Sequence, residues 1–266
     1  MNKKQKFDTP ELSVEELSKA LYEVNLQLQE SNNKLQEEQR KKTEFYANIS
    51  HDLRAPITAI SNSVQYLLSG QDIEKSEAIE TLQIVNKRVE YLQKMINDIF
   101  LLSSLDSSEQ KVHKEKVDVS FFLEDFYYMC EADERFEKAK LELSIAEDLE
   151  ATLMMDPYLM QMALDNLFTN ALKYGGNQPE IKLEAYMEND TIVIKVCDTG
   201  IGISEENLKH IFERSYQVEK ARTPEAGNGS GFGLSIVKSI VEHHGGSIDC
   251  ESKIGVGSKF IIKLPK

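Results

Sequence analysis

The spacing of apolar residues predicts a long helix in the first part of the chain. From Val14 to Leu35, apolar residues recur in alternating steps of three and four, with Ser31 filling one position. The apolar members of this stripe are Val14, Leu17, Leu21, Val24, Leu28 and Leu35. This period is typical of a helix that meets a partner helix along a narrow seam. We therefore expect residues 1–44 to form a coiled-coil signalling helix in a parallel dimer. A single amphipathic helix packed on its own domain is the alternative.

The same register continues toward a histidine. Phe45 and Ile49 restore the apolar stripe after two polar positions, and His51 follows two residues beyond Ile49. His51 is therefore expected on an exposed face of the helix. Pro56 lacks an N–H and crowds the carbonyl of Asp52, so we expect a bend just after the histidine.

A second long helix follows the first. The apolar pattern resumes over residues 57–68, and Ser69 to Asp72 ends the first helix. Apolar residues then keep three-four spacing over residues 76–105. Two long helices joined by a short turn form an antiparallel hairpin, which would become a four-helix bundle in a dimer. Residues 103–116 are polar and are interpreted as a linker.

Beyond residue 116 the pattern changes to short elements. Strands are predicted at 117–119, 141–145, 150–155, 180–187, 191–198, 247–251 and 258–264. Helices are predicted at 120–138, 157–174, 204–212 and 231–244. Asp156 and Pro157 are suited to cap and begin a helix. Helices mixed with antiparallel strands indicate the α+β class, as an α/β sandwich.

Composition narrows the range of functions. The chain has 266 residues, 41% hydrophobic and 29% charged, which predicts a folded core. Its net charge of −14 argues against non-specific binding to nucleic acid or to anionic lipid. The three cysteines lack metal spacing and are expected to be reduced, as in the cytoplasm. Since no run approaches ~18 apolar residues, the protein is expected to be cytoplasmic, or the cytosolic portion of a membrane-bound sensor.

Three stretches of the second half are suited to holding a nucleotide. A helical row in residues 157–174 offers amide oxygens for Mg²⁺ and an amine for phosphate. Its members are Asn166, Asn170, Lys173 and Tyr174. The stretch DTGIGIS begins with Asp198, which could accept a hydrogen bond from the exocyclic amine of adenine. Its Gly200 and Gly202 would let the backbone approach a planar ring.

The third stretch, GNGSGFG, covers residues 227–233 and precedes a helix, where backbone N–H groups favour phosphate. It lacks the lysine of a P-loop, and no βαβ unit surrounds it. Each stretch alone could be an ordinary solvated helix face or glycine turn.

Their order along the chain is more specific. Residues 45–266 resemble the bacterial sensor histidine kinases. FYANISHDLRAPIT is similar to the phosphoacceptor box of that family, and DNLFTNALKY to its asparagine box. DTGIGI, IFERSY and GNGSGFGLSIVK are similar to its first glycine, phenylalanine and second glycine boxes. The resemblance implies a dimerisation and phosphotransfer hairpin at 45–111 and an ATP-binding domain of the GHKL (Bergerat) type at 112–266.

The resemblance also implies the roles of individual residues. His51 would accept the γ-phosphoryl group of ATP, and Asp52 would hold or deprotonate the other ring nitrogen. Asn170 would be the Mg²⁺ ligand, with Asn166 nearby. The remaining nucleotide-binding residues would be Lys173, Tyr174, Asp198, Gly200, Gly202, Arg214, Gly227, Gly229, Gly231, Gly233 and Leu234.

Two positions depart from the family pattern. The family often has threonine or asparagine four residues after the histidine, where this chain has Ala55; we expect weak phosphatase activity. The phenylalanine box continues as Ser215, Tyr216 and Gln217 instead of ending in arginine. Lys220 or Arg222 could take over that phosphate contact.

We therefore predict an ATP-dependent protein-histidine kinase that works as a homodimer with Mg²⁺. It would autophosphorylate on His51 and pass the phosphoryl group to an aspartate of a response regulator receiver domain, docked around residues 57–68. A dimeric scaffold that binds nucleotide without transferring phosphate is the alternative. His243 and His244 are expected to cap a helix and to interact favourably with its dipole, whereas His113 and His210 show no partner pattern in the sequence and are expected to be solvent residues.

Overall fold

The structure is a computed structural model that describes residues 13–69, 73–106, 112–147, 149, 151–214, 216 and 231–266. The chain divides into two compact units, Met1–His51 and Asp52–Lys266.

The first unit contains most of the long helix α1, Val14–Leu68, which continues into the second unit. Along this part of the chain the apolar stripe is open to solvent: Val14 is 88% exposed, Leu21 66% and Leu28 65%. Ile49 is buried and His51 is exposed, as the register predicted. A helix with such an exposed apolar stripe is expected to be stable in water only when another surface covers the stripe.

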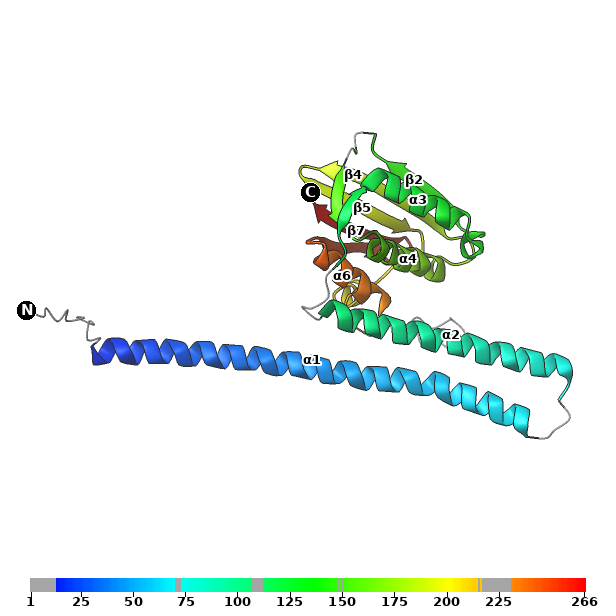
Figure 1. Cartoon of the computed structure of the whole chain (residues 1–266), viewed down its shortest axis with the longest axis horizontal. Helices are drawn as coiled ribbons and strands as arrows, with labels where there is room; N and C mark the ends of the chain where they lie inside the picture. Colours follow the sequence, from blue (N-terminus) through cyan, green and yellow to red (C-terminus); the bar gives the residue numbers. More distant parts are fainter. Residues whose placement is uncertain are drawn as a thin grey trace, which may run out of the picture. The chain divides into compact units, whose positions relative to one another are not determined.

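The second unit opens with a helical hairpin. The end of α1 and the helix α2, Lys75–Asp106, lie side by side (Figure 1). Near the turn, the hydroxyl of Tyr66 donates a hydrogen bond of 2.7 Å to Glu77 Oε1. The predicted hairpin is confirmed. Because α1 runs through Pro56 as one helix, the bend expected there stays a prediction.

The rest of the second unit is built on a five-stranded sheet with the order β2-β4-β5-β7-β6. These strands are β2 (Lys140–Ile145), β4 (Glu180–Glu188), β5 (Thr191–Asp198), β6 (Ser247–Lys253) and β7 (Gly257–Pro265). A separate antiparallel pair joins β1 (Glu115–Asp118) to β3 (Thr152–Met155). The helices are α3 (Val119–Glu131), α4 (Pro157–Tyr174), α5 (Glu205–Leu208) and α6 (Gly233–His243), with a 3₁₀ turn at Glu134–Phe136.

One strand pairing differs from the sequence expectation. β2 pairs with β4 in parallel, whereas the other neighbours in the sheet are antiparallel. The connection from β2 to β4 passes through β3 and the helix α4, which is long enough to return the chain to the same end of the sheet. The sequence pattern indicated antiparallel strands and assigned no partner to β2, so this parallel pair is a correction to it, while the α/β sandwich is confirmed.

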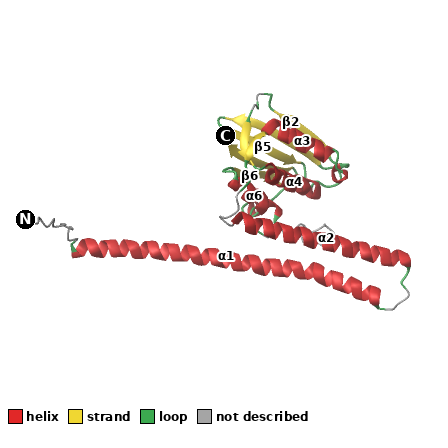
Figure 2. Cartoon of the chain, viewed as in Figure 1, coloured by secondary structure: helices red, strands yellow, loops and turns green. Residues whose placement is uncertain are grey.

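The helices α3, α4 and α6 form a layer over one face of this sheet (Figure 2). Alternate residues of β4 face that layer: Ile181, Leu183 and Ala185 are at most 2% exposed. The residues between them lie on the opposite face, where the amine of Lys182 contacts Glu142 at 3.1 Å and Glu184 at 2.9 Å. The core thus lies between the two layers, and the outer face is charged.

Two helices are shorter than predicted. The helix expected at 120–138 ends at Glu131, because Asp133 begins a new turn by accepting a hydrogen bond of 2.8 Å from Arg135 N. The helix expected at 204–212 ends at Leu208, although Ser204 caps it as expected. Cys130, Cys197 and Cys250 are free thiols. In the part of the chain that the structure describes, no helix is long and apolar enough to span a bilayer.

Candidate phosphotransfer and nucleotide site

The histidine of the first box is presented on α1. The side chain of His51 is exposed, and that of Asp52 is half-buried. Within the second unit, Asp52 lies close enough to Tyr91 of α2 to act on it. The pKa of the Tyr91 hydroxyl is raised, first by burial and then by the charge of Asp52. The charge of Asp52 therefore lies within electrostatic reach of α2. Tyr91 belongs to no box, so the sequence could not have indicated it.

The helix α4 carries the asparagine box. Asp156 caps it, since its Oδ1 accepts a hydrogen bond of 3.1 Å from Leu159 N, and Pro157 occupies the first helical position. Leu164, Leu167 and other apolar residues are buried between α4 and the sheet. This burial fixes which way the remaining side chains of the helix point.

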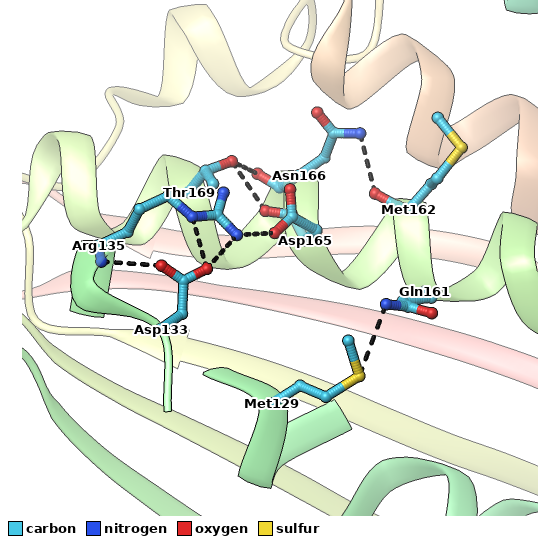
Figure 3. Close-up of polar contacts among 8 residues, drawn as sticks. All are labelled: Met129, Asp133, Arg135, Gln161, Met162, Asp165, Asn166 and Thr169. Atoms are coloured by element: carbon cyan, nitrogen blue, oxygen red, sulfur yellow. Dashed lines mark hydrogen bonds and ion pairs between the residues drawn. The ribbon is translucent and has the colours of Figure 1, made fainter. Parts of the chain in front are cut away.

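The four polar residues of the row on α4 are all partly exposed. Asn166 Nδ2 donates a hydrogen bond of 2.9 Å to Met162 O, which leaves the amide oxygen directed away from that carbonyl (Figure 3). The amine of Lys173 lies 5.0 Å from the ring centre of Tyr174. Asn170 is on the same row, one turn beyond Asn166.

The neighbouring residue Asp165 has a different partner. Its carboxylate accepts a hydrogen bond of 2.9 Å from Arg135, which also contacts Asp133 (Figure 3). This cluster ties the 3₁₀ turn to α4. Asp165 is thus engaged by a structural ion pair, whereas Asn166 points elsewhere.

Asp198 ends β5 and is held by two backbone groups. Its Oδ1 accepts hydrogen bonds of 2.8 Å from Gly200 N and 3.2 Å from Ser258 N. Burial raises the pKa of the Asp198 carboxyl, and these hydrogen bonds partly offset the rise. The geometry therefore fixes the orientation of the Asp198 carboxylate through its Oδ1. Ser258, sixty residues further on, was missed by sequence reasoning.

The glycines after Asp198 are required by close contacts. A Cβ on Gly200 would lie 2.6 Å from Tyr174 O, and one on Gly202 would lie 2.1 Å from Lys253 O. Gly202 also has a φ of +70°, which side chains rarely adopt. Ile201 N donates a hydrogen bond of 3.1 Å to Tyr174 O. This loop is therefore attached to the carboxyl end of α4.

The second glycine box reaches α4 at a different point. Gly233 begins α6, and a Cβ added there would lie 3.1 Å from Asn166 Oδ1. Gly231 has a φ of +71°, and Leu234 is partly exposed. Gly227 and Gly229 lie outside the described residues. The two glycine boxes thus approach the same helix, one at Asn166 and the other at Tyr174.

The phenylalanine box provides Arg214. Its guanidinium pairs with the carboxylate of Asp106, the last residue of α2, so the expected phosphate contact stays a prediction. Tyr216 donates a hydrogen bond of 2.9 Å to Asn207. Ser215, Gln217, Lys220 and Arg222 lie outside the described residues.

A hollow of about 450 Å³ lies between α2 and α4. Its lining residues are Lys94, Asn97, Asp98, Tyr158, Gln161, Met162, Asp165 and Asn166. Asn166 is therefore one of the residues that border the hollow between α2 and α4. Among the described residues, no group of three or more His, Cys, Asp or Glu side chains is placed to hold a metal ion.

One expectation about the histidines was wrong, namely that His244 interacts with the helix dipole as a cation. His210 is partly exposed, its Nδ1 lies 2.9 Å from Glu213 Oε1, and its ring lies 5.6 Å from that of Tyr216. His244 is the C-cap of α6, but it is buried and its Nε2 accepts a hydrogen bond from Asp156 N. A ring in this state is neutral and does not oppose the helix dipole as a cation would. His113 is exposed, as expected, although its backbone N–H bonds to Asp156.

Family comparisons match both parts of the chain. Residues 41–108 match the His Kinase A (phospho-acceptor) domain. Residues 155–266 match the histidine kinase-, DNA gyrase B- and HSP90-like ATPase.

Named relatives and solved structures agree with this. The chain is 34% identical to the sensor protein kinase WalK of Staphylococcus saprophyticus over 231 residues, which are 85% of this chain and 37% of that protein. It is 32% identical to a WalK from Staphylococcus aureus over 232 residues, covering 85% of this chain and 54% of the relative. The chain thus spans about half or less of the length of these relatives.

Two solved structures share the fold. Histidine kinase ThkA, solved in complex with response regulator protein TrrA, has a TM-score of 0.68 at 22% identity, over 84% of this chain and 61% of that one. Acinetobacter baumannii histidine kinase AdeS has a TM-score of 0.63 at 21% identity, over 81% of this chain and 97% of that one. The chain belongs to the sensor histidine kinases, with a phosphoacceptor domain followed by an ATPase domain of the gyrase B and HSP90 type.

Proposed function

We propose that this chain autophosphorylates on His51 with ATP and then passes the phosphoryl group to an aspartate of a response regulator. One observation carries the proposal: both glycine boxes meet the asparagine box on α4, in a chain that presents an exposed histidine on α1. Catalysis of phosphoryl transfer depends mainly on positioning and on stabilisation of charge. A nucleotide grip and an accessible acceptor are what such a reaction requires.

The acceptor acts through the lone pair of one ring nitrogen. That nitrogen attacks the γ-phosphorus, the bond to the bridging oxygen breaks, and ADP leaves. Asp52 holds the proton on the other ring nitrogen and so keeps the attacking nitrogen unprotonated. The aspartate of the receiver domain then takes the phosphoryl group from His51.

The nucleotide lies along α4 in this proposal. Asp198 accepts a hydrogen bond from the adenine amine, and Tyr174 lies against the base. Lys173 and Arg214 contact phosphates, so Arg214 would exchange Asp106 for the nucleotide. The second glycine box closes over the triphosphate, with Gly231 and Gly233 at its end.

The residues present fit Mg²⁺ brought in with ATP. Asn170 would hold the ion through its amide oxygen, a hard ligand of the kind that Mg²⁺ prefers. In this proposal the phosphates of the nucleotide would supply further oxygen ligands. When bound, the ion neutralises charge that develops on the phosphates.

A homodimer accounts for the exposed stripe on α1. Leu17, Val24 and Leu35 are more than half exposed in the single chain, and a second copy in parallel register would cover them. A receiver domain is proposed to dock around residues 57–68, where Ile57 is 54% and Leu68 78% exposed. The site of action proposed for this chain is the cytoplasm, where ATP and receiver domains are found.

The test is incubation with γ-labelled ATP, followed by treatment of the labelled protein with acid and with base. Phosphohistidine is lost in acid and kept in base, and we expect such label in the wild type and none in His51→Gln. His113→Gln is the matched control, since it removes another exposed histidine and should leave the label intact. Nucleotide binding without any label would favour the scaffold alternative.

A further inference from the structure

His244 joins two helices at a buried point. It is 6% exposed, and its Nδ1 lies 2.7 Å from Ile240 O in its own helix. Its Nε2 lies 2.9 Å from the backbone N of Asp156, which can only donate. One neutral tautomer satisfies both contacts: Nδ1–H donates to Ile240 O, and the lone pair on Nε2 accepts from Asp156.

Asp156 is the residue at which α4 begins. Its side chain accepts hydrogen bonds of 3.1 Å each from Leu159 N and His113 N, and it is 8% exposed. The contact from His244 therefore reaches the N-cap of the helix that carries the nucleotide row. It also lies next to His113, which shortly precedes β1.

The two helices run in opposite directions and touch at two defined points. His244 at the end of α6 meets Asp156 at the start of α4. Gly233 at the start of α6 meets Asn166. Asp156 and Asn166 are about 15 Å apart along α4, and Gly233 and His244 about 16 Å apart along α6, from the rise per residue of a helix. The two spans match, so both contacts are made at once.

Apolar packing between these contacts does not set the register by itself. Ile236, Val237 and Ile240 of α6 are fully buried, and α4 contributes Met160 and Ala163. Burial of apolar surface is not directional, so it tolerates small sliding or rotation. A hydrogen bond between a ring nitrogen and a backbone N–H requires a narrow range of distance and angle.

We propose that His244 is a positioning residue for nucleotide binding, which fixes the register of α6 on α4 and thereby the point where the second glycine box joins Asn166. The proposal rests on the proposed function, because it assumes that this glycine box contacts ATP. His244 itself lies at the far end of α6 from Gly233, so it acts only through the helix.

The electrostatic surroundings keep the ring neutral. Burial lowers the pKa of His244, and the nearby Lys114 and His243 add to this effect. The hydrogen bond to Ile240 O and the charge of Asp156 act in the opposite direction. The acceptor on Nε2 is therefore available at neutral pH.

The experiment compares two amides at this position in the full chain. His244→Gln places an amide oxygen near the position of Nε2 and keeps an acceptor for Asp156 N–H. His244→Asn is one carbon shorter and does not reach. His243→Asn is the matched control. The ring of His243, one residue before His244, bonds to Ser239 O within its own helix α6. Affinity for a non-hydrolysable ATP analogue is measured by titration, and KM and kcat by autophosphorylation.

The expected result is a split among these variants. His244→Asn should weaken analogue binding and raise KM for ATP by about 3- to 10-fold, the value of one ordinary hydrogen bond. His244→Gln and His243→Asn should stay within about twofold of wild type. Equal affinities for His244→Asn and wild type, both folded by circular dichroism, would overturn the proposal. So would a Gln variant as weak as the Asn variant.

A second measurement covers the case in which His244→Asn does not fold. Protonation of His244 removes the acceptor, so analogue affinity of the wild type should fall more steeply below neutral pH than that of His244→Gln. Parallel pH profiles would refute the proposal. A wild type that binds no analogue at all would instead refute the proposed function, which keeps the two failures apart.

Discussion

We expect the buried carboxylate of Asp198 to lower the stability of the nucleotide-free protein and to increase its affinity for nucleotide. In Asp198→Asn the amide oxygen can still accept the hydrogen bonds from Gly200 N and Ser258 N. The variant has no buried charge to desolvate, so we expect its midpoint of thermal unfolding without nucleotide to equal or exceed that of wild type.

The sign of the pH dependence follows from the raised pKa of Asp198. The native state holds this proton at a higher pH than the unfolded state, so its contribution is fully present below the unfolded value and is lost as pH rises through the native value. The advantage of the Asn variant should therefore be largest near neutral pH and should disappear in acid.

The affinity for nucleotide, in contrast, should be lower in Asp198→Asn than in wild type. An amide donor facing the adenine amine forfeits a hydrogen bond to a charged group, about 1.5–3 kcal/mol, or about 10- to 150-fold in affinity. At a nucleotide concentration 100 times the wild-type Kd, wild type gains about 2.7 kcal/mol, and a variant that binds 100-fold more weakly gains about 0.4 kcal/mol. For a unit of this size these gains correspond to about 5–11 °C and about 1–2 °C.

The assay is thermal unfolding with and without Mg-ATP, with Asp249→Asn as control. Asp249 is an exposed acid on β6, and its replacement should change neither midpoint by more than about 1 °C. An Asp198→Asn variant that melts lower without nucleotide, or that keeps the full nucleotide shift, would refute the reasoning.

Three further predictions concern other positions. Gly202→Ala should lower the free energy of unfolding, measured in urea, by more than about 1 kcal/mol, because the added Cβ would overlap Lys253 O. Gly255→Ala is the control, since Gly255 has a similar φ of +76° but open space around it, and it should lower the free energy of unfolding less. Equal decreases in the two variants would contradict the clash. Because the pKa of His244 is lowered, its stabilising contribution is present above its unfolded value and lost as pH falls through the native one, so unfolding measured from pH 7 to pH 5 should show a steeper loss in wild type than in His244→Gln. Ala55→Thr should gain dephosphorylation of the phosphorylated regulator, measured as release of phosphate, and an unchanged rate would count against the role given to this position.

Much of the fold follows from local patterns in the sequence. The three-four spacing that predicts α2 and the cap formed by Asp156 depend on residues close together in the chain, and both are confirmed. The parallel pairing of β2 with β4 was missed, because the choice of a strand partner depends on the path of the intervening helix.

The site was less accessible to sequence reasoning where contacts are long-range. The hydrogen bond from Ser258 N to Asp198 joins two strands with no shared motif. His243 and His244 look equivalent in the sequence, but a rotation of about 100° per residue turns only His244 toward α4. The pairing of Arg214 with Asp106 likewise joins residues from separate elements.

The place of β7 in the sheet has a consequence for how the protein is made. β7 lies between β5 and β6, and its Ser258 N holds Asp198 Oδ1. Before residues 257–265 have been synthesised, β5 lacks β7 as its neighbouring strand. The Asp198 carboxylate then also lacks the hydrogen bond from Ser258 N. If Asp198 binds the nucleotide as proposed, we expect the ligand to stabilise a nascent chain only after residues 257–265 have emerged and β7 has joined the sheet.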